Sequence, residues 1–511
     1  MSEYSGHTFL GFSACVPRGL IPDKLYFSVF CPSVRTDGQG RPQVAPCGIR
    51  RIEAALLRYG FQRDEVAVAH PDHLNAFIGN ATKVIGITES DPLGIGPATS
   101  TFTQIFGGEA YMAIKFRELL RNSRLRKQDV KIIMGGPGAW QLQGDLQKKL
   151  GIDTLVLGEG EEVVGPLFEK ATRGESLPDV MQTGPVDEND VPTLVGPSVL
   201  GITEIARGCG RGCDFCTPTL LRLRSFSLEH VLEDVEANLS GGRQPLLHAE
   251  DVLRYKAKGM EINRQAVVEL FRAVSSFPGV QKVAISHFAL SSVMSSPGLI
   301  EDISTVLHLG ENGRWLGGQT GIETGSSKLM EKHMLGKCLP FHAEDWPEIV
   351  TDAFQILSEN HWVPCATLIL GLPGESEEDV VETIELVERL RRFRSLLVPL
   401  FFVPMGRLKE KAEALTLKDV TARRGELIVR CWDHNMSWLP ALMKGAEDNL
   451  KMHYAVKPVL AFGALRTRQF LRRCEIEYGY DLRAMIADLR HEPVTHTESR
   501  LNGALLTSRK H

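Results

Sequence analysis

The sequence predicts an α/β protein: an N-terminal doubly wound domain, a central partial (β/α)6 barrel and a mainly helical C-terminal region. Short, continuously apolar runs alternate with amphipathic helical patterns, which is typical of buried parallel strands covered by helices. This alternation occurs twice, once on each side of a polar, proline-containing stretch at residues 174–196. From about residue 416 the pattern is mostly helical. These observations together predict two parallel sheets followed by a helical region.

The length of the chain also indicates several domains. Its 511 residues correspond to about two to four domains at roughly 150 residues each. We expect the first domain at 1–173, a linker at 174–196, the barrel at 197–415 and a helical domain at 416–511. This last region carries 16 Lys and Arg against 11 Asp and Glu, so we expect a basic element there.

Composition excludes disordered and fibrous proteins, because 43% of the residues are apolar and 24% are charged. No apolar stretch reaches the roughly 20 residues that a membrane-spanning helix needs. The N-terminus also lacks the basic and apolar regions of a secretory signal. We therefore expect a cytoplasmic protein with no membrane partner.

Four apolar runs are the candidate strands of the first sheet: Glu65–Ala69, Lys83–Thr88, Lys131–Met134 and Thr154–Leu157. The last three lead into loops that contain glycines. Ligands of doubly wound sheets bind at such strand ends, where glycine lets the backbone approach a ligand closely. We expect a flat ligand there, although tight turns alone would also explain each loop. No Gly-x-Gly-x-x-Gly motif follows the first strand, which argues against nicotinamide or flavin.

Six further runs are the candidate strands of the barrel: Val199–Ile205, Leu246–Glu250, Val283–His287, Gly318–Glu323, Ala366–Gly371 and Leu396–Phe402. Amphipathic segments between them are expected to form the outer helices.

The strongest chemical signal is a group of three cysteines. Cys209, Cys213 and Cys216 have C-x3-C-x2-C spacing directly after the first candidate barrel strand. Soft thiolate ligands favour zinc or an iron–sulfur cluster. A structural zinc site usually has four protein ligands, whereas three thiolates on a four-iron cluster leave one iron open to a substrate. We expect the cluster, with a zinc knuckle as the alternative.

The same segment, with Phe215 before the last cysteine, resembles the radical S-adenosylmethionine (SAM) enzymes. The segments Gly321–Ser326 and Leu368–Glu375 look like the family's contacts to the ribose and adenine of SAM. The resemblance implies a [4Fe–4S] cluster on the three cysteines and a SAM site. The residues that it implies around SAM are Glu250, Glu323, Ser326 and Gly371.

The glycine loops ahead of the barrel are similar to the cobalamin domain of class B radical SAM methyltransferases, in which methylcobalamin supplies the methyl group. The resemblance implies cobalamin contacts from Gly94, Thr99, Ser100, Gly135, Gly136, Gly158, Gly160 and Glu161. The usual Asp-x-His-x-x-Gly motif is absent, since His73 directly follows Asp72. We therefore expect no histidine as the lower ligand of cobalt.

Within this class, residues 91–111 look most like archaeal enzymes that modify methyl-coenzyme M reductase. The resemblance implies C-methylation of an sp3 carbon, specifically Cα of a glutamine of that reductase, as a post-translational modification linked to methanogenesis. The expected partners are a peptide segment of the reductase alpha subunit and a reductant protein such as a ferredoxin. A monomer without nucleic acid is expected.

Tyr111 and Tyr255 are hydroxyl-bearing candidates for the active-site region, but tyrosines packed in the core are the simpler alternative.

Two other functions remain open. A methylthiotransferase would carry a second cluster on three N-terminal cysteines, for which Cys15, Cys31 and Cys47 are candidates. A non-catalytic carrier of a cluster or of cobalamin is the other alternative, but it would not need the two SAM-like segments of the barrel.

Overall fold

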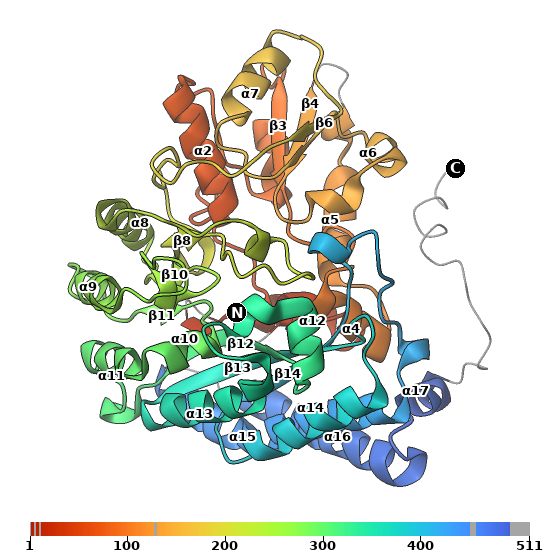
Figure 1. Cartoon of the computed structure of the whole chain (residues 1–511). Helices are drawn as coiled ribbons and strands as arrows, with labels where there is room; N and C mark the ends of the chain where they lie inside the picture. Colours follow the sequence, from red (N-terminus) through yellow and green to blue (C-terminus); the bar gives the residue numbers. More distant parts are fainter. Residues whose placement is uncertain (1, 5–6, 10–11, 127–129, 450–455, 491–511) are drawn as a thin grey trace.

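The structure is a computed structural model that describes residues 2–4, 7–9, 12–126, 130–449 and 456–490. A smaller α/β part lies above a larger barrel, and the last helices lie along the bottom of the molecule (Figure 1). Within these ranges, no helix is both long enough and apolar enough to cross a lipid bilayer.

The N-terminal part contains a parallel sheet in the order β3-β4-β5-β6. Its strands are β3 (Val84–Thr88), β4 (Lys131–Gly135), β5 (Thr154–Leu157) and β6 (Val180–Gln182). Its helices are α2 (Cys47–Tyr59), α4 (Pro97–Phe106), α5 (Tyr111–Leu120), α6 (Asp145–Leu150) and α7 (Val164–Thr172). Phe116 of α5 packs with Ile132 on one face of the sheet, and Leu167 of α7 packs with Ile133 on the other. The sheet is therefore covered by helices on both faces, as predicted.

Two details of this sheet differ from the prediction. The candidate first strand Glu65–Ala69 forms no strand, so the sheet begins at β3. The stretch 174–196, expected to be a linker, instead supplies the edge strand β6. Val180 and Gln182 are exposed and Met181 packs against the apolar cluster around Ile133, so β6 shows no apolar run in the sequence. The predicted domain boundaries themselves stay a prediction.

The central part is an open barrel of six parallel strands. Its strands are β7 (Ile202–Glu204), β10 (Leu246–His248), β11 (Ala284–Ile285), β12 (Leu316–Glu323), β13 (Trp362–Leu370) and β14 (Leu396–Phe401). They form two three-stranded sheets, joined by a parallel bridge between His287 and Gln319. The helices of this part are α8 (Leu228–Ser240), α9 (Arg264–Ser275), α10 (Leu290–Ser295), α11 (Pro297–Val306), α12 (Ser327–Cys338), α13 (Trp346–Glu359) and α14 (Glu377–Leu390). The predicted partial (β/α)6 barrel is confirmed.

The C-terminal part is helical, as predicted, with α15 (Ala422–Asn449), α16 (Val456–Tyr478) and α17 (Leu482–Arg490). Helix α15 packs on the edge strand β14. The Asn435 side chain accepts a hydrogen bond from Leu397 N at 2.7 Å and donates one to Leu397 O at 2.8 Å. These bonds satisfy backbone groups that an edge strand otherwise leaves open to another chain.

Candidate functional site

The three clustered cysteines lie in the loop of a short antiparallel hairpin. The hairpin consists of β8 (Ala206–Arg207) and β9 (Arg224–Ser225), so residues 208–223 form its loop. Gly208 has a φ of +73°, and a Cβ at this position would collide with Arg222 O. Glycine is required there because other residues rarely adopt this backbone conformation. Cys209 N then donates to Leu221 O at 3.1 Å and holds the loop closed.

The chemistry of this loop fits a thiolate-bound cluster. Cys209 and Cys213 are buried, and burial raises the pKa of both thiols while the Arg211 cation opposes the increase. Metal coordination would favour the deprotonated thiolates. Among the described residues, no three His, Cys, Asp or Glu side chains stand in a metal-binding arrangement, so the three-cysteine ligand set stays a prediction.

Arg211, between the first two cysteines, fixes the loop to the barrel. Its guanidinium is buried and contacts Asp251 Oδ2 at 3.0 Å, Ser291 Oγ at 3.0 Å and Ser292 Oγ at 2.8 Å. Ser291 and Ser292 lie on α10, and Asp251 follows β10. The cysteine loop is therefore connected to the carboxyl ends of neighbouring barrel strands, where (β/α) barrels usually carry their active sites.

Lys337 is the functional candidate that sequence reasoning missed. Its Nζ lies 2.6 Å from Glu323 Oε1, and both side chains are almost buried. Burial lowers the pKa of Lys337, but its ion pair with Glu323 and its electrostatic interactions with Cys213 and Cys216 outweigh this effect and raise the pKa overall. Lys337 therefore lies beside the cysteine loop as a cation. Nothing in its local sequence indicates this, because its neighbours come from a strand end and a loop that are distant in the chain.

Two of the predicted SAM residues converge on Lys337. Glu323 ends β12 with a φ of +65°, which is rare for a residue other than glycine. Burial raises the pKa of Glu250, and electrostatic interactions with His248 and Lys337 oppose this increase. The structure thus brings together two acidic groups, a cation and the cysteine loop at one end of the barrel. Such a set can bind the ammonium and carboxylate groups of an amino acid.

Ser326 and Gly371, the other two predicted SAM residues, shape the backbone of the strand ends. Ser326 is fully buried, donates a hydrogen bond to Asp379 Oδ1 at 2.6 Å, and caps the N-terminus of α12. Gly371 has a φ of +82°, and its N–H donates to Glu375 Oε2 at 2.9 Å. Their contact with SAM stays a prediction.

The first glycine loop, which leads into α4, touches the barrel. Thr101 Oγ1 in α4 accepts a hydrogen bond from Phe401 N, the last residue of β14, at 2.8 Å. Because α4 follows the carboxyl end of β3, the carboxyl ends of the two sheets face each other. Asp91 in this loop is buried, and its Oδ2 atom has no hydrogen-bond partner. A buried acceptor of this kind fits a ligand that carries amide N–H donors, as cobalamin does.

The protein itself fills the space beside several predicted cobalamin residues. Gly136 and Gly158 have positive φ, and a Cβ on them would collide with Thr88 Oγ1 and Thr183 Oγ1. The same close packing occurs at Gly94 beside Ala110, at 3.2 Å from the position of a Cβ, and at Gly160 beside Ile52, at 3.1 Å. Close packing within the protein is thus one reason for glycine at these four positions, and their contact with cobalamin stays a prediction.

The remaining predicted cobalamin residues have mixed surroundings. The nearest atom to a Cβ on Gly135 would be Val156 Cβ, at the ordinary distance of 3.6 Å. Thr99 is buried in α4, and Ser100 Oγ accepts a hydrogen bond from Gln104. Glu161 forms an ion pair with Arg207 of the cysteine hairpin at 2.8 Å. Cobalamin binding by these residues stays a prediction.

The two candidate tyrosines both donate hydrogen bonds within the protein. Tyr111 donates to Asp23 Oδ1 at 2.7 Å, and Tyr255 donates to Phe226 O at 2.9 Å. Burial is the main cause that raises the pKa of each phenol to about 12. Each tyrosine thus has a structural partner that explains its hydroxyl.

Cys47 has different neighbours from the other two candidate ligands of a second cluster. Cys15 and Cys31 both lie near Tyr26. Cys47 instead lies near Glu204, Arg51 and Asp234, which form ion pairs between α2 and the barrel. This separation argues against these three cysteines as ligands of one cluster.

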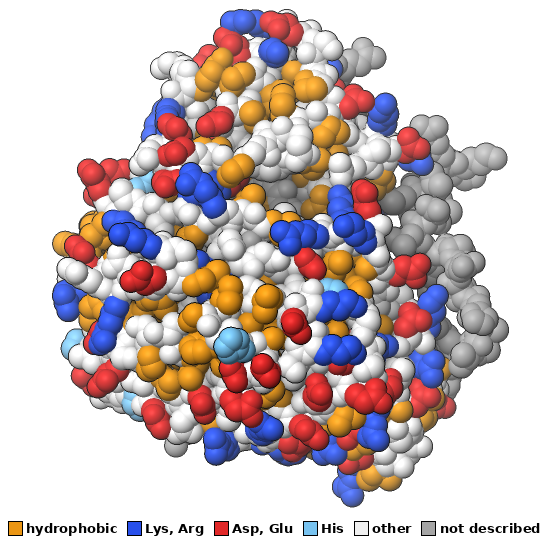
Figure 2. Space-filling view, viewed as in Figure 1, with side chains coloured by type: hydrophobic (Ala, Val, Ile, Leu, Met, Phe, Trp, Pro, Cys, Tyr) orange, Lys and Arg blue, Asp and Glu red, His pale blue; other side chains and the backbone are white. Residues whose placement is uncertain are grey.

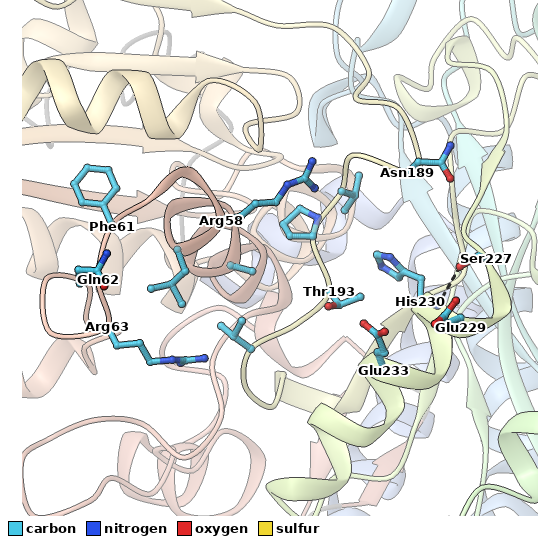
Figure 3. Close-up of a pocket in the computed structure, with 15 residues that line it drawn as sticks. Arg58, Phe61, Gln62, Arg63, Asn189, Thr193, Ser227, Glu229, His230 and Glu233 are labelled. Carbon is cyan, nitrogen blue, oxygen red and sulfur yellow. Dashed lines mark hydrogen bonds between the residues drawn. The ribbon is translucent and has the colours of Figure 1, made fainter.

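A surface cavity of about 680 Å³ lies between α2, residues 189–195 and the start of α8 (Figure 3). Arg58 and Arg63 reach it from the N-terminal part, whereas His230 and Glu233 line it from α8. None of the predicted site residues lines this cavity. On the face shown in Figure 2, Lys and Arg side chains lie near the junction of the two parts, and acidic side chains gather along the lower edge.

Comparison with known proteins gives partial matches. No protein-family model matches the chain. It is 25% identical over 241 residues to tRNA-2-methylthio-N(6)-dimethylallyladenosine synthase of Desulfosudis oleivorans, covering 44% of the chain and 46% of that protein. It is 27% identical over 199 residues to ribosomal protein uS12 methylthiotransferase RimO of Thermotoga maritima, covering 37% and 41%. The chain spans about half the length of the curated relatives it matches.

A solved structure resembles a larger share of the chain. The radical SAM methyltransferase TsrM of Kitasatospora setae, with bound tryptophan substrate and a SAM analogue, matches with a TM-score of 0.52 at 14% identity. The match covers 71% of this chain and 72% of that protein. The chain therefore has a fold like that of this radical SAM methyltransferase, and over part of its length it is similar to methylthiotransferases.

Proposed function

We propose that the chain is a cobalamin-dependent radical SAM C-methyltransferase that methylates an sp3 carbon. One observation carries the proposal: the carboxyl edges of two parallel sheets face each other, with the three-cysteine hairpin attached at their junction. The likeness to a radical SAM methyltransferase supports it, because a match to 71% of the chain extends beyond the barrel at 197–415.

Residues at the two facing sheet edges would bind different cofactors. Cys209, Cys213 and Cys216 would hold the cluster, while Glu250, Glu323 and Lys337 would orient the methionyl end of SAM. The loop around Asp91 would hold cobalamin through its unpartnered carboxylate oxygen. When bound, these groups supply an electron, a radical precursor and a methyl carrier. The protein itself would hold the cluster, SAM and cobalamin at fixed positions relative to one another and exclude water.

The proposed substrate is a peptide, and within this class a glutamine of methyl-coenzyme M reductase. Its support is the resemblance of residues 91–111 to archaeal enzymes that modify that reductase. A reductant protein such as a ferredoxin would supply the electron.

Metal content tests the proposal. The protein is purified without oxygen, supplied with iron, sulfide and hydroxocobalamin, and analysed for iron and cobalt. We expect about four irons and one cobalt per chain. Methyl transfer from SAM is then assayed with a synthetic peptide that spans the reductase glutamine and with the same peptide carrying alanine instead. Protein without cobalt would overturn the cobalamin-dependent function. Equal labelling of both peptides would overturn the proposed glutamine substrate.

The second candidate function is methylthiotransfer, which the curated relatives favour. It predicts about eight irons per chain, because a second cluster is required. The surroundings of Cys47 place that thiol away from the other two candidate ligands. A result of eight irons in wild type that falls to four in Cys47→Ala would establish this alternative.

A further inference from the structure

The hairpin that carries the three cysteines is fixed at its base by two arginines. Arg207 and Arg224 are directly opposite each other in the β8–β9 register. Arg207 contacts Glu159 Oε2 at 3.1 Å and Glu161 Oε1 at 2.8 Å, and Arg224 contacts both oxygens of Glu159. Both glutamates lie in the loop after β5, at the carboxyl edge of the N-terminal sheet. We call these four residues the interdomain clamp.

The position of the clamp in the chain gives it control over the cysteine loop. Arg207 is two residues before Cys209, and Arg224 closes the hairpin eight residues after Cys216. Both ends of the loop are thus tied to the same acidic segment of the other domain. Movement of the N-terminal sheet relative to the barrel must either break these ion pairs or displace the cysteine loop.

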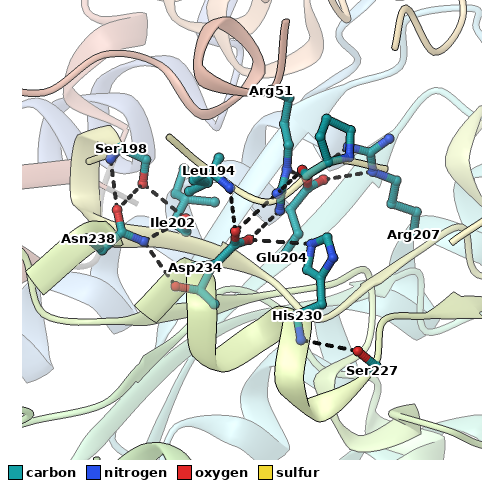
Figure 4. A network of polar contacts seen from close by, with 12 residues as sticks. Arg51, Leu194, Ser198, Ile202, Glu204, Arg207, Ser227, His230, Asp234 and Asn238 are labelled. Atoms are coloured by element: carbon teal, nitrogen blue, oxygen red, sulfur yellow. Dashed lines mark hydrogen bonds and ion pairs between the residues drawn. The ribbon is translucent and has the colours of Figure 1, made fainter. Parts of the chain in front are cut away.

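Further contacts extend the clamp into the core of the interface. Arg207 Nε donates to Glu204 Oε1 at 3.1 Å, and Arg51 of α2 contacts both Glu204 at 3.1 Å and Asp234 of α8 (Figure 4). Arg224 also donates to Val186 O, and Val186 N donates to Glu159 Oε2 at 3.0 Å. The ion pairs therefore link four segments that are distant in the sequence.

The clamp is charged although it is largely buried. Arg224 is 2% exposed, and Arg207 and Glu159 are 14% and 16% exposed. Burial raises the pKa of Glu159, but its bonds to Arg224 and Val186 N and the charge of Arg207 outweigh it, so the pKa is lowered overall. Buried ion pairs commonly add less stability than apolar packing of the same volume, and their best attested use is to fix register and orientation. Their concentration at this one interface indicates a role in orientation.

We propose that the interdomain clamp sets the position of the cysteine loop relative to the ligand edge of the N-terminal sheet. Its four members are positioning residues that place the cluster and the methyl carrier at a fixed distance. In this proposal Glu161 acts through its ion pair with Arg207 and not through a contact with cobalamin. The role of the clamp in methyl transfer rests on the proposed function, whereas its control of the cysteine loop does not.

The test compares Glu159→Gln/Glu161→Gln with wild-type full-length protein reconstituted with iron and sulfide. The matched control is Glu169→Gln, which removes an exposed ion pair to Arg173 on α7 of the same domain. In hydrogen–deuterium exchange, we expect residues 208–223 of the double variant to lose protection by about tenfold or more, with no change in the control. Unchanged exchange in this loop would overturn the proposal.

A second readout measures distance directly. Hydroxocobalamin is added and reduced to Co(II), and the dipolar coupling between Co(II) and the reduced cluster is recorded. Wild type and Glu169→Gln should give one narrow distance, and the double variant a broadened one. A narrow, unchanged distance in the double variant would overturn the proposed role of the interdomain clamp. Absence of cobalt binding in wild type would instead overturn the proposed function, while the exchange experiment still decides the clamp.

A third variant tests the proposal even if the double variant does not fold. Arg224→Lys keeps the positive charge but loses the two-pronged guanidinium that contacts both oxygens of Glu159. We expect it to show the same loss of protection at residues 208–223, with a circular dichroism spectrum like that of wild type. Wild-type protection in this variant would count against a geometric role for Arg224.

Discussion

Lys337 Nζ lies 2.6 Å from Glu323 Oε1, and this ion pair connects the end of strand β12 to helix α12, where the Lys337 carbonyl accepts a hydrogen bond from Arg211 of the cysteine loop at 3.2 Å. The Lys337 side chain is 15% exposed and that of Glu323 8%. The two charges therefore depend on each other, because a buried charge without its partner is strongly unfavourable.

We predict that Lys337→Met destabilises the protein by about 3 kcal/mol, because Glu323 would stay buried without its cation. The measurement is the apparent unfolding temperature by circular dichroism. Lys332→Met on the same helix is the control, since Lys332 is exposed and its Nζ donates a hydrogen bond to Pro373 O at 3.0 Å. Addition of Glu323→Gln to Lys337→Met should recover part of the loss. Equal shifts in Lys337→Met and Lys332→Met would contradict the prediction.

Gly336, the residue before Lys337, lies against the cysteine loop. A Cβ at Gly336 would collide with the backbone carbonyl of Arg211, which cannot rotate away. We predict that Gly336→Ala displaces the loop and lowers the iron bound per chain by more than half. Iron and labile sulfide are measured after reconstitution. Gly463→Ala in α16 is the control, because no atom lies within 4 Å of a Cβ there, and alanine favours a helix by up to about 1 kcal/mol.

Loss of any one clustered cysteine should remove the cluster. We predict that Cys209→Ala, Cys213→Ala and Cys216→Ala each reduce iron from about four atoms per chain to nearly none, since the cluster needs all three thiolates. Cys31→Ala, at an exposed cysteine outside the loop, should keep the wild-type content. A single zinc per chain in wild type, lost in the same three variants, would instead support the zinc knuckle.

The barrel could be predicted from the sequence because its strands are buried on both faces. The runs that begin at Leu246, Ala366 and Leu396 are mostly apolar, and the structure places strands over all three. The edge strand β6 could not be predicted, since Val180 is exposed and no apolar pattern marks the strand. The prediction of a strand at Glu65–Ala69 was wrong for the opposite reason. The composition of this run suits a strand, but no neighbouring strand pairs with it in the described structure.

The candidate site was likewise predictable from the sequence only in part. Glycine and cysteine spacing identified the loop around Cys209, because the backbone geometry there depends on local residues. Glu161 was predicted to contact a cofactor, and its partner Arg207 lies 46 positions further along the chain. Lys337 gave no local signal at all. Residues whose role depends on contacts across domains need the folded structure.

The acid dependence of stability provides the last prediction and concerns Glu204. Burial raises the pKa of this carboxyl, but Arg207 and Arg51 outweigh it and hold the pKa far below its usual value near 4.3. A carboxyl with a lowered pKa in the folded state stabilises the protein above its unfolded pKa. This contribution is lost as the pH falls, because the unfolded state then binds the proton more readily.

We therefore predict that wild type is more stable than Glu204→Gln at pH 7 and that this difference shrinks below pH 4, by about 1.4 kcal/mol per pH unit. The unfolding temperatures of both proteins are measured from pH 7 to pH 3. Glu236→Gln is the control because Glu236 is exposed on α8, and its difference from wild type should stay near zero throughout. A Glu204→Gln difference that is the same at pH 7 and pH 3 would show that the two arginines do not stabilise the charged form of Glu204.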